Sequence, residues 1–222
     1  VSNQATQLRR SSRFNVLDEV ALIRSLARMC KTAGSVNELL GLEGEASNIY
    51  FRNFRGMLAD GYRDVFADDW QGRVGRGALD RVNVALNYVY GMLLAEVIRG
   101  IHASGLDPHA GFVHSSGRNK PALGLDLMEQ FRPIIADSVV LNAINNGELK
   151  PGMFTEVLGG SRLTDEGRKV LITVYERRMQ QTIKHPVFGY QTTWRRAVEV
   201  QARMILGVID GSQSTYVGIR TR

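Results

Sequence analysis

The 222-residue sequence predicts an all-α protein, with several helices in one domain and at most one small β-hairpin. Three observations favour this fold class. Apolar residues recur at helical spacing over long stretches, and helix-capping residues precede several of these stretches. Alternation of apolar and polar residues, which is typical of strands, is scarce. No set of strands could therefore form the core of a sheet.

Three helices are expected in the first half of the chain. One covers residues 18–30, and its first residue, an aspartate, can cap it. A second covers residues 35–57, because Ser35 and Glu38 have the spacing of a capping box. The longest lies within residues 79–105, where an apolar stripe with a period of 3.6 residues continues until a glycine.

The second half of the chain predicts two more helices and little extended structure. One helix begins at residue 164 and ends before the His-Pro pair at 185–186, and another covers residues 193–211. Residues 157–163 favour a small hairpin, and residues 216–219 a short extended piece. The glycine-rich residues 72–77 are typical of a mobile loop, since no strand precedes them to form a phosphate cradle.

The composition excludes several classes of protein. No stretch approaches the roughly 18 to 20 consecutive apolar residues of a membrane span, and residues 1–13 lack a signal-peptide core. The single cysteine, Cys30, cannot form an internal disulfide and is too few for a zinc-thiolate site. We therefore expect a cytoplasmic protein with no membrane partner.

The net charge of +6 is unevenly distributed. Residues 1–34 carry +4 and residues 162–203 carry +5, whereas residues 35–106 and 107–161 carry −2 each. Basic segments favour a polyanionic partner such as nucleic acid. The acidic middle of the chain would repel the phosphates of such a partner unless a cation lay between carboxylate and phosphate. This pattern therefore indicates a cation site.

The segment most suited to chemistry is residues 105–114, which places two histidines in a turn of small and apolar residues. Twelve residues beyond His114, Asp126 and Glu129 lie three apart, which places both carboxylates on one helical face. Their neighbours are apolar, so the two acids need a positive charge. Arg132 could supply it as an ordinary ion pair, or a divalent metal could satisfy both acids.

A third acid, Glu43, stands out because Gly41 and Gly44 bracket it within a helical stretch. Glycine costs a helix about 1 kcal/mol relative to alanine, so this pattern favours close approach of a ligand or of another helix. Structural roles remain open for all the candidates. Glu43 could be a solvated helix residue, His114 a core histidine, and the two later acids one polar face.

A set of motifs follows one order along the chain: residues 41–44, 50–51, 83–88, 105–114, 125–133, 142–147, 154 and 163–169. Together they resemble the CRISPR-associated integrase family, whose members insert new spacers into the CRISPR array in antiviral defence. The resemblance covers roughly residues 36–183, and the paired motifs at 105–114 and 125–133 are specific.

The resemblance implies a helical catalytic domain that binds one divalent cation, magnesium or manganese. Its ligands would be Glu43, His114 and Glu129, and Asp126 would support the site. The family often has aspartate where this chain has Glu129. The implied activity is that of a metal-dependent DNA endonuclease and integrase, in which a 3′-hydroxyl attacks a phosphodiester.

The implied substrate is double-stranded DNA, namely the prespacer and the repeat array. The basic segments would contact its backbone, with Arg9, Arg10 and Arg13 in a flexible arm. Solvated helix faces are the alternative role for each arginine. The other candidate DNA-binding residues are Arg73, Arg76, Arg132, Arg177, Arg178, Arg195 and Arg196.

The expected organisation is a basic N-terminal linker or helix (1–34), the metal-dependent helical domain (35–211) and a C-terminal tail (212–222). Family members usually begin with a β-rich domain that mediates homodimer formation and docking of a small ferredoxin-like partner. Only about 35 residues precede the first motif here. The chain is therefore expected to be a catalytic fragment or part of a fusion with a reverse transcriptase or nuclease.

Two other functions stay open from the residues. The chain could be a non-catalytic DNA-holding subunit with a vestigial metal site. It could also hold an iron site made of His109, His114 and either Asp126 or Glu129. Glu45, two residues beyond Glu43, has no explanation in either scheme.

Overall fold

The structure is a computed structural model that describes residues 1–59, 63–115, 117 and 119–221. Helices form most of it, which confirms the all-α class. The α-helices are α1 (Ser2–Ser11), α2 (Leu17–Met29), α3 (Val36–Arg52), α4 (Arg63–Asp69), α5 (Arg81–Ala103), α6 (Ala122–Met128), α7 (Ser138–Asn145), α8 (Asp165–Gln180) and α9 (Trp194–Ile209). The shorter elements are the 3₁₀ turns η1 (Phe54–Met57) and η3 (Pro151–Met153), the π-helix η2 (Arg132–Asp137), and the strands β1 (Phe154–Val157), β2 (Gly160–Leu163), β3 (Thr182–Lys184) and β4 (Gln191–Thr193).

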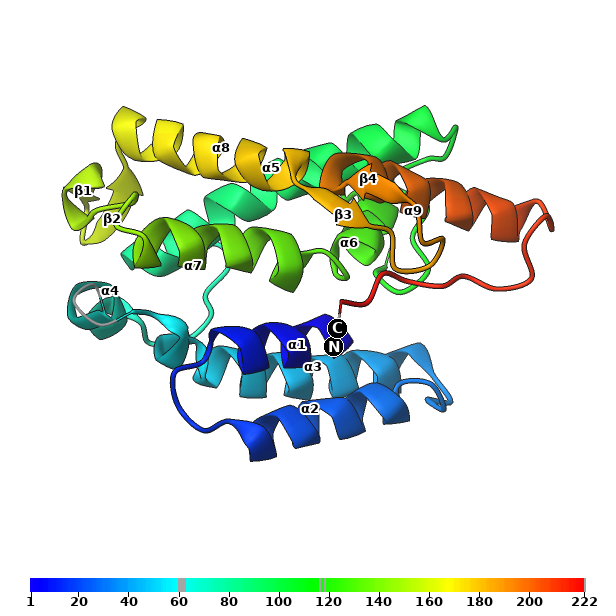
Figure 1. The fold of residues 1–222 in the computed structure, drawn as a ribbon, viewed down its shortest axis with the longest axis horizontal. Helices are drawn as coiled ribbons and strands as arrows, with labels where there is room; N and C mark the ends of the chain where they lie inside the picture. Colours follow the sequence, from blue (N-terminus) through cyan, green and yellow to red (C-terminus); the bar gives the residue numbers. More distant parts are fainter. Residues whose placement is uncertain (60–62, 116, 118, 222) are drawn as a thin grey trace.

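The helices form two layers. Helices α1, α2 and α3 pack on one another in the lower layer of Figure 1, and α5 to α9 lie above them. Helix α5 contacts α6, α7, α9 and η2, so it is the central element of the upper layer. By length and composition alone α5 could cross a membrane, but half of its most apolar window is buried inside this fold.

Side-chain caps fix where the main helices begin. Ser35 accepts a hydrogen bond from the Glu38 amide (3.1 Å), and Thr164 accepts one from the Gly167 amide (3.1 Å), which confirms both expected starts. Helix α9 likewise begins after Thr193. Helix α5 ends at Ala103, shortly before Gly105 with its positive φ of 76°, as the sequence predicted.

Two expectations about the helices are wrong. Helix α2 begins at Leu17 with Val16 as its N-cap residue, so Asp18 lies in the first turn rather than capping it. Gly41 and Gly44 lie inside a continuous α3, and a Cβ built on either would meet no described atom within 4 Å. The glycines therefore do not mark the close approach of another helix.

The described residues form two β-hairpins, whereas at most one was expected. Strands β1 and β2 pair antiparallel as predicted, with Phe154 opposite Leu163. Strands β3 and β4 form a second hairpin, with Thr182 opposite Thr193. Each strand of the second hairpin has three residues, which is too short for alternation to show in the sequence.

The two ends of the described chain meet between the layers (Figure 1). Asn3 donates to the backbone oxygens of Gln130 (2.7 Å) and Ile219 (2.9 Å), and it accepts from the Thr221 amide (3.1 Å). Helix α1 is therefore packed into the fold. Arg9 and Arg10 lie in its last turn, which corrects the expectation that they belong to a flexible arm.

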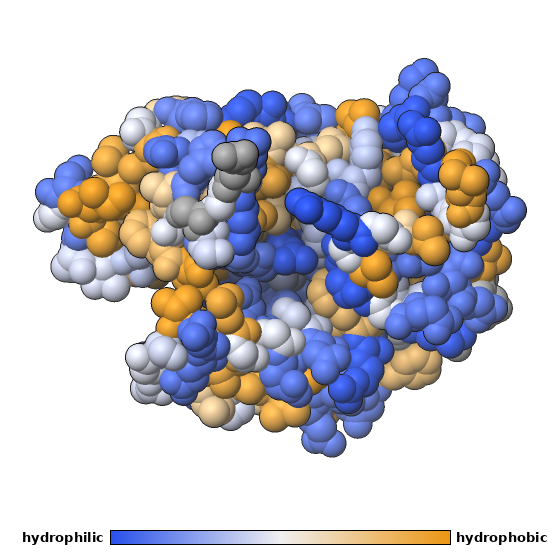
Figure 2. All heavy atoms as spheres, turned by 180° about the vertical axis from the view of Figure 1, so that it is seen from behind, coloured by the Kyte–Doolittle hydropathy of each residue, from blue (hydrophilic) through white to orange (hydrophobic). Residues whose placement is uncertain are grey.

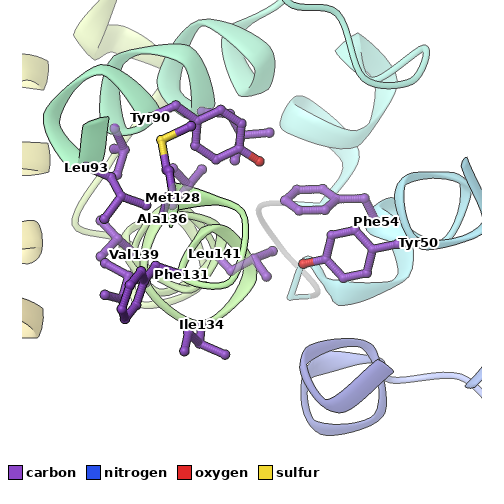
Figure 3. Close-up of a cluster of buried hydrophobic side chains, with 14 of the residues drawn as sticks. Tyr50, Phe54, Tyr90, Leu93, Met128, Phe131, Ile134, Ala136, Val139 and Leu141 are labelled. Atoms are coloured by element: carbon purple, nitrogen blue, oxygen red, sulfur yellow. The ribbon is translucent and has the colours of Figure 1, made fainter. Parts of the chain in front are cut away.

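Aromatic and aliphatic side chains join the two layers. Figure 3 shows Tyr50 and Phe54 from the lower layer pointing toward a group that includes Tyr90, Met128 and Leu141. Tyr50 and Phe54 are fully buried, with ring centroids 6.2 Å apart. This shared core fixes α3 relative to α5 and α6, and so positions the site described next.

Candidate metal centre

One cavity of about 320 Å³ gathers the four acidic and histidine candidates. Glu43 comes from the middle of α3, and His114 from the loop after α5. Asp126 comes from α6, and Glu129 caps the end of that helix. The structure thus brings together residues from three separate segments. We call this cavity the acid pocket; it is also lined by Val1, Ser2, Ala27, Cys30, Lys31, Leu39, Val113 and Arg220.

The charge of Glu43 is only partly compensated within this pocket. Burial is the main cause that raises its pKa, and the nearby charge of Glu129 raises it further. The charges of the Val1 α-amino group, of His114 and of Arg132, in that order, lower the pKa of Glu43 but do not cancel the shift. Glu43 accepts no hydrogen bond from the residues that the structure describes. Two carboxylates in one partly buried pocket therefore repel each other and favour a cation between them.

Asp126 orders the loop that carries His114. One carboxylate oxygen accepts from the amides of Phe112 (2.7 Å) and Val113 (3.0 Å), and the other accepts from the His114 amide (2.9 Å). Burial alone would raise the pKa of Asp126, but these bonds and the one from the His114 ring outweigh it and lower the pKa. Asp126 is therefore an ionised anchor.

The same carboxylate sets the tautomer of His114. The ring Nδ1 lies 2.6 Å from Asp126 Oδ1. Because an ionised carboxylate only accepts, Nδ1 carries the proton and donates it, and Nε2 keeps its lone pair. A histidine that is oriented by a carboxylate through one ring nitrogen is the usual arrangement of a metal ligand.

The loop fits against α6 because residue 111 is glycine. A Cβ built on Gly111 would lie 2.5 Å from the Cβ of Ala122 and 2.9 Å from its carbonyl carbon. Any side chain there would push the loop away from the start of α6. Gly111 therefore allows Asp126 to reach the amides of residues 112–114.

Glu129 is held by an arginine. Arg132 donates to Glu129 Oε1 (2.6 Å), and its guanidinium lies over the Tyr90 ring, 4.4 Å from the centroid. This is the ion pair that the spacing of the sequence allowed, and it involves Glu129 rather than Asp126. Asp126 and Glu129 therefore have different partners although they lie three residues apart.

A second buried acid, Asp137, lies behind the acid pocket and was missed in the sequence. It is 1% exposed and accepts from the hydroxyls of Tyr90 (2.5 Å) and Tyr50 (3.0 Å). Burial raises its pKa to about 6, although the tyrosine hydrogen bonds and the Arg132 charge oppose the shift. One signal could have revealed it: it is the only charged residue of the apolar run 133–141.

The π-helix η2 explains how Tyr90 contacts both Arg132 and Asp137. These two residues are the ends of η2, five positions apart, and the i to i+5 hydrogen bonding of a π-helix brings such positions to one side. A small void of about 10 Å³, room for about one water molecule, is lined by Glu43, Glu129 and Arg132 as well as by Asp137. Arg132 thus links the two acidic sites.

The donor types of the acid pocket fit a divalent cation. Two carboxylates and an imidazole suit magnesium or manganese, and no thiolate-rich shell is present. Within the described ranges, no three histidine, cysteine or acidic side chains are already close enough to one another to hold a metal ion. Binding would therefore require Glu43, His114 and Glu129 to draw together around the ion.

His109 and Glu45 lie outside the acid pocket. His109 pairs with Asp107 (3.1 Å) in the turn after α5, and its side chain is 54% exposed. Unlike His114, His109 does not line the acid pocket, whereas a site with two histidines and one acid would need both rings there. Glu45 is exposed on α3, two residues beyond Glu43.

The candidate DNA-binding arginines have three kinds of surroundings. Arg73 and Arg132 pack inside the fold: Arg73 donates to Asn87 (2.6 Å) and lies over the Tyr90 ring. Arg76 and Arg178 line two separate cavities, each of about 680 Å³. The other three form ion pairs on helix surfaces: Arg177–Glu148, Arg195–Glu176 and Arg196–Glu199.

The expected mobile loop at 72–77 is hydrogen-bonded to α5. Fully buried Asn83 accepts from the Val74 amide (3.0 Å) and donates to the Gly72 oxygen (2.7 Å), while Asn87 donates to the Gly75 oxygen (2.7 Å).

Hydrophilic residues gather in a hollow near the middle of the face seen from behind, above the α1–α3 layer (Figure 2). The surface is therefore concave and polar near the junction of the two layers.

Comparisons with known proteins agree on one family. A family model described as CRISPR associated protein Cas1 matches residues 1–177. A CRISPR-associated exonuclease Cas4/endonuclease Cas1 fusion of Geobacter sulfurreducens is 42% identical over 228 residues, covering 100% of this chain and 41% of that protein. A CRISPR-associated endonuclease Cas1 of Thermus thermophilus is 37% identical over 190 residues, covering 86% of this chain and 58% of that protein.

Solved structures share the fold. A casposase bound to integration product has a TM-score of 0.77 and 25% identity, covering 96% of this chain and 57% of that chain. A chain of a Cas6-RT-Cas1–Cas2 complex has a TM-score of 0.81 and 22% identity, covering 100% of this chain and 24% of that chain. The chain thus spans about half the length, or less, of the relatives that it matches.

Proposed function

The chain belongs to the CRISPR-associated protein Cas1 family, and from this premise we propose that it is the catalytic region of a metal-dependent DNA integrase of CRISPR adaptation. The reaction would be a transesterification, in which the 3′-hydroxyl of a prespacer strand attacks a phosphodiester of the repeat array. One observation carries the proposal: Glu43, His114 and Glu129 line one pocket although they come from separate segments of the chain.

We assign the metal ligands to Glu43, His114 through Nε2, and Glu129. When bound, a magnesium or manganese ion would polarise the phosphate and stabilise the charge on its oxygens. Asp126 holds His114 in the tautomer that leaves Nε2 available (Nδ1 to Oδ1, 2.6 Å). Arg132 holds Glu129 by a 2.6 Å hydrogen bond and so limits its rotation. Lys31 and Arg220, which also line the pocket, would attract the phosphate backbone.

The proposed partners follow from the relatives. Double-stranded DNA, as prespacer and repeat array, would be the substrate, and the exposed arginines Arg76, Arg177 and Arg196 and the half-buried Arg195 would lie along it. We also propose a homodimer and a small ferredoxin-like partner in the complete assembly. The similarity to a Cas4/Cas1 fusion along the whole chain supports a place within a larger fusion with a nuclease or a reverse transcriptase.

A strand-joining assay tests the proposal. A labelled duplex with 3′-hydroxyl ends is incubated with a supercoiled plasmid that carries a repeat, with Mn²⁺, Mg²⁺ or EDTA. Joining should need the metal, and Glu43→Ala, His114→Ala and Glu129→Ala should each abolish it while helical content is kept. Glu45→Ala is the matched control, because this acid lies on the same helix outside the pocket. Joining at the wild-type rate by a ligand variant would refute that ligand.

A second function has one observation in its favour. Among the described residues, the three proposed ligands are not close enough to coordinate a metal as they stand. A DNA-holding subunit with a vestigial site would show this arrangement too. Binding of DNA and of Mn²⁺ without any strand joining, in a protein that also contains the regions present in the longer relatives, would favour this alternative.

A further inference from the structure

Arg73 is firmly held, although it lines neither the acid pocket nor the cavity around Arg76. Its Nη1 donates to Asn83 Oδ1 (2.9 Å), and its Nη2 donates to Asn87 Oδ1 (2.6 Å). Both asparagines belong to α5 and lie four residues apart. Arg73 forms no ion pair with a described carboxylate. Two amide oxygens therefore fix the plane of this guanidinium.

The guanidinium of Arg73 lies over the ring of Tyr90, 4.9 Å from the centroid, and it also lies 6.0 Å from the centroid of Phe51. The face of an aromatic ring attracts a cation, and the attraction is stronger where water is excluded. Tyr90 is only 8% exposed, and the Nε atom of Arg73 is buried. The contact between Arg73 and the Tyr90 ring is therefore largely dry, and it holds the ring from one direction.

Tyr90 is held from a second direction by its hydroxyl, which donates to the buried Asp137 (2.5 Å). A ring that is fixed at its face and at its hydroxyl has little freedom to tilt. The guanidinium of Arg132 lies over this same ring, 4.4 Å from the centroid. Tyr90 therefore gives Arg132 a fixed support.

Arg132 in turn holds Glu129 by donating to its Oε1 atom (2.6 Å). Among the described residues, no donor bonds the Oε2 atom of Glu129, so this oxygen is available to an ion. Glutamate has one more rotatable bond than the aspartate that is frequent at this position in the family. Its carboxylate therefore loses more conformational freedom on binding a metal unless another residue restricts it first.

We propose that Arg73 is a positioning residue of the metal centre, which acts on Glu129 through the Tyr90 ring and Arg132. It contacts neither the ion nor the DNA. By keeping the support of Arg132 in place, Arg73 limits the rotation of the Glu129 carboxylate and lowers the entropy lost when an ion binds. The inference rests on the proposed function, because it takes Glu129 to be a metal ligand.

Calorimetric titration with Mn²⁺ in the absence of DNA tests the proposal. Arg73→Met and Arg73→Lys should each weaken Mn²⁺ binding by about fivefold, because neither side chain has the planar fork that bonds both asparagines and covers the ring. The lysine variant keeps the positive charge. Wild-type affinity in Arg73→Lys, with a loss only in Arg73→Met, would show an effect of charge alone and would overturn the proposal.

Two variants of Tyr90 examine the middle of the connection. Tyr90→Phe keeps the ring and should retain the Mn²⁺ affinity within about threefold, whereas Tyr90→Leu removes the aromatic face and should lose as much as the Arg73 variants. Equal affinities in Tyr90→Phe and Tyr90→Leu would contradict a role of the ring.

A double-mutant cycle separates positioning from a general loosening of the fold. Arg132→Met cuts the connection to Glu129, so adding Arg73→Met to it should change Mn²⁺ affinity by less than about twofold. The same fivefold loss in both backgrounds would show that Arg73 affects the site in another way. If Arg73→Met does not fold, as judged by circular dichroism, Arg73→Lys takes its place in the cycle. The electron paramagnetic resonance spectrum of bound Mn²⁺, recorded at saturating metal, should also change in the Arg73 variants, since it reports the geometry of the ligands.

Arg81→Met is the matched control. Arg81 is a half-buried arginine at the start of α5 that pairs with Asp69 (2.6 Å), and its loss should leave Mn²⁺ affinity unchanged. Glu129→Ala distinguishes the two proposals. If this variant binds Mn²⁺ like the wild type, Glu129 is not a ligand and both proposals fail. If Glu129→Ala weakens binding while the Arg73 variants bind normally, only the positioning role is overturned.

Discussion

In the acid pocket, burial and then the charge of Glu129 raise the pKa of Glu43, and among the described residues only Arg132 forms an ion pair with either acid. Behind it, Asp137 is almost fully enclosed, yet two tyrosine hydroxyls donate to it. Glu43 and Glu129 of the acid pocket are only half-buried, and Glu43 has no described hydrogen-bond donor, whereas two hydroxyls donate to the fully enclosed Asp137. The acid pocket instead opens to a cavity of about 320 Å³.

This difference separates a structural acid from a functional one. A buried acid that the fold satisfies with its own hydroxyls contributes to packing and tolerates neutralisation. A pair of acids that repel each other across a cavity is stable only when a cation enters. Arg132 belongs to both sites, since it pairs with Glu129 and lies over the ring of Tyr90, which donates to Asp137.

The strongest test of this comparison is Glu43→Gln. Without metal, the change should leave the melting temperature unchanged or raise it, because it removes a buried charge that faces Glu129. With Mn²⁺, strand joining should fall by about three orders of magnitude, since a ligand and its charge are lost. Thermal unfolding in EDTA and initial joining rates measure the two effects. A clear loss of metal-free stability would show that Glu43 is not in repulsive surroundings.

Asp126 should give the next largest effect. Asp126→Ala removes the acceptor for three loop amides and for His114 Nδ1, so Mn²⁺ affinity should fall by about 10- to 100-fold. Asp126→Asn keeps one acceptor oxygen and should lose less. Calorimetric titration with Mn²⁺ measures the affinity. If the alanine variant binds Mn²⁺ like the wild type, the loop holds His114 without Asp126.

Much of the fold could be predicted because its signals are local. The capping residues Ser35, Thr164 and Thr193 and the stripe of α5 each act within a few residues of one helix. The β3–β4 hairpin could not be predicted, because its two strands are short and depend on packing between α8 and α9. The packing of α1 depends on contacts with residues 130 and 219–221, which no local pattern encodes.

The candidate site likewise has features that the sequence could predict and features that it could not. The spacing of Asp126 and Glu129 and the two nearby histidines suggested a metal, but choosing Glu43 as the third ligand required the family resemblance. The different partners of Asp126 and Glu129 could not be predicted, because His114 lies in a loop and Arg132 in a π-helix. The bracketing glycines drew attention to Glu43, which lines the acid pocket, but the close approach that they were taken to indicate does not occur among the described residues.

The Asp137 site should respond to pH rather than to metal. Its pKa of about 6 in the folded state lies above the roughly 3.9 of an unfolded aspartate. The unfolded state therefore releases this proton first as pH rises, and the group's contribution lowers the free energy of unfolding between about pH 4 and pH 7. In Asp137→Asn that contribution is absent.

Urea unfolding of both proteins at pH 4.5 and 7.5 measures this contribution. When the pH rises from 4.5 to 7.5, the free energy of unfolding should change by about 2 kcal/mol more in the destabilising direction for the wild type than for Asp137→Asn. Mn²⁺ affinity should differ by less than about threefold, because Asp137 is not a ligand. An identical pH dependence in the two proteins would show that Asp137 is ionised in the fold at pH 4.5.

The smallest effect is expected at His109, which lies outside both acidic sites. An iron site of two histidines and one acid would use His109 with His114, whereas the structure pairs His109 with Asp107 in an exposed turn. His109→Ala should therefore change Mn²⁺ or Fe²⁺ affinity by less than about twofold, while His114→Ala should lower it by more than about tenfold. Metal titrations of both variants compare two histidines of the same motif, residues 105–114. Loss of binding in His109→Ala would mean that the loop rearranges to bring the second imidazole to the metal, and Glu43 would then no longer be needed as the third ligand.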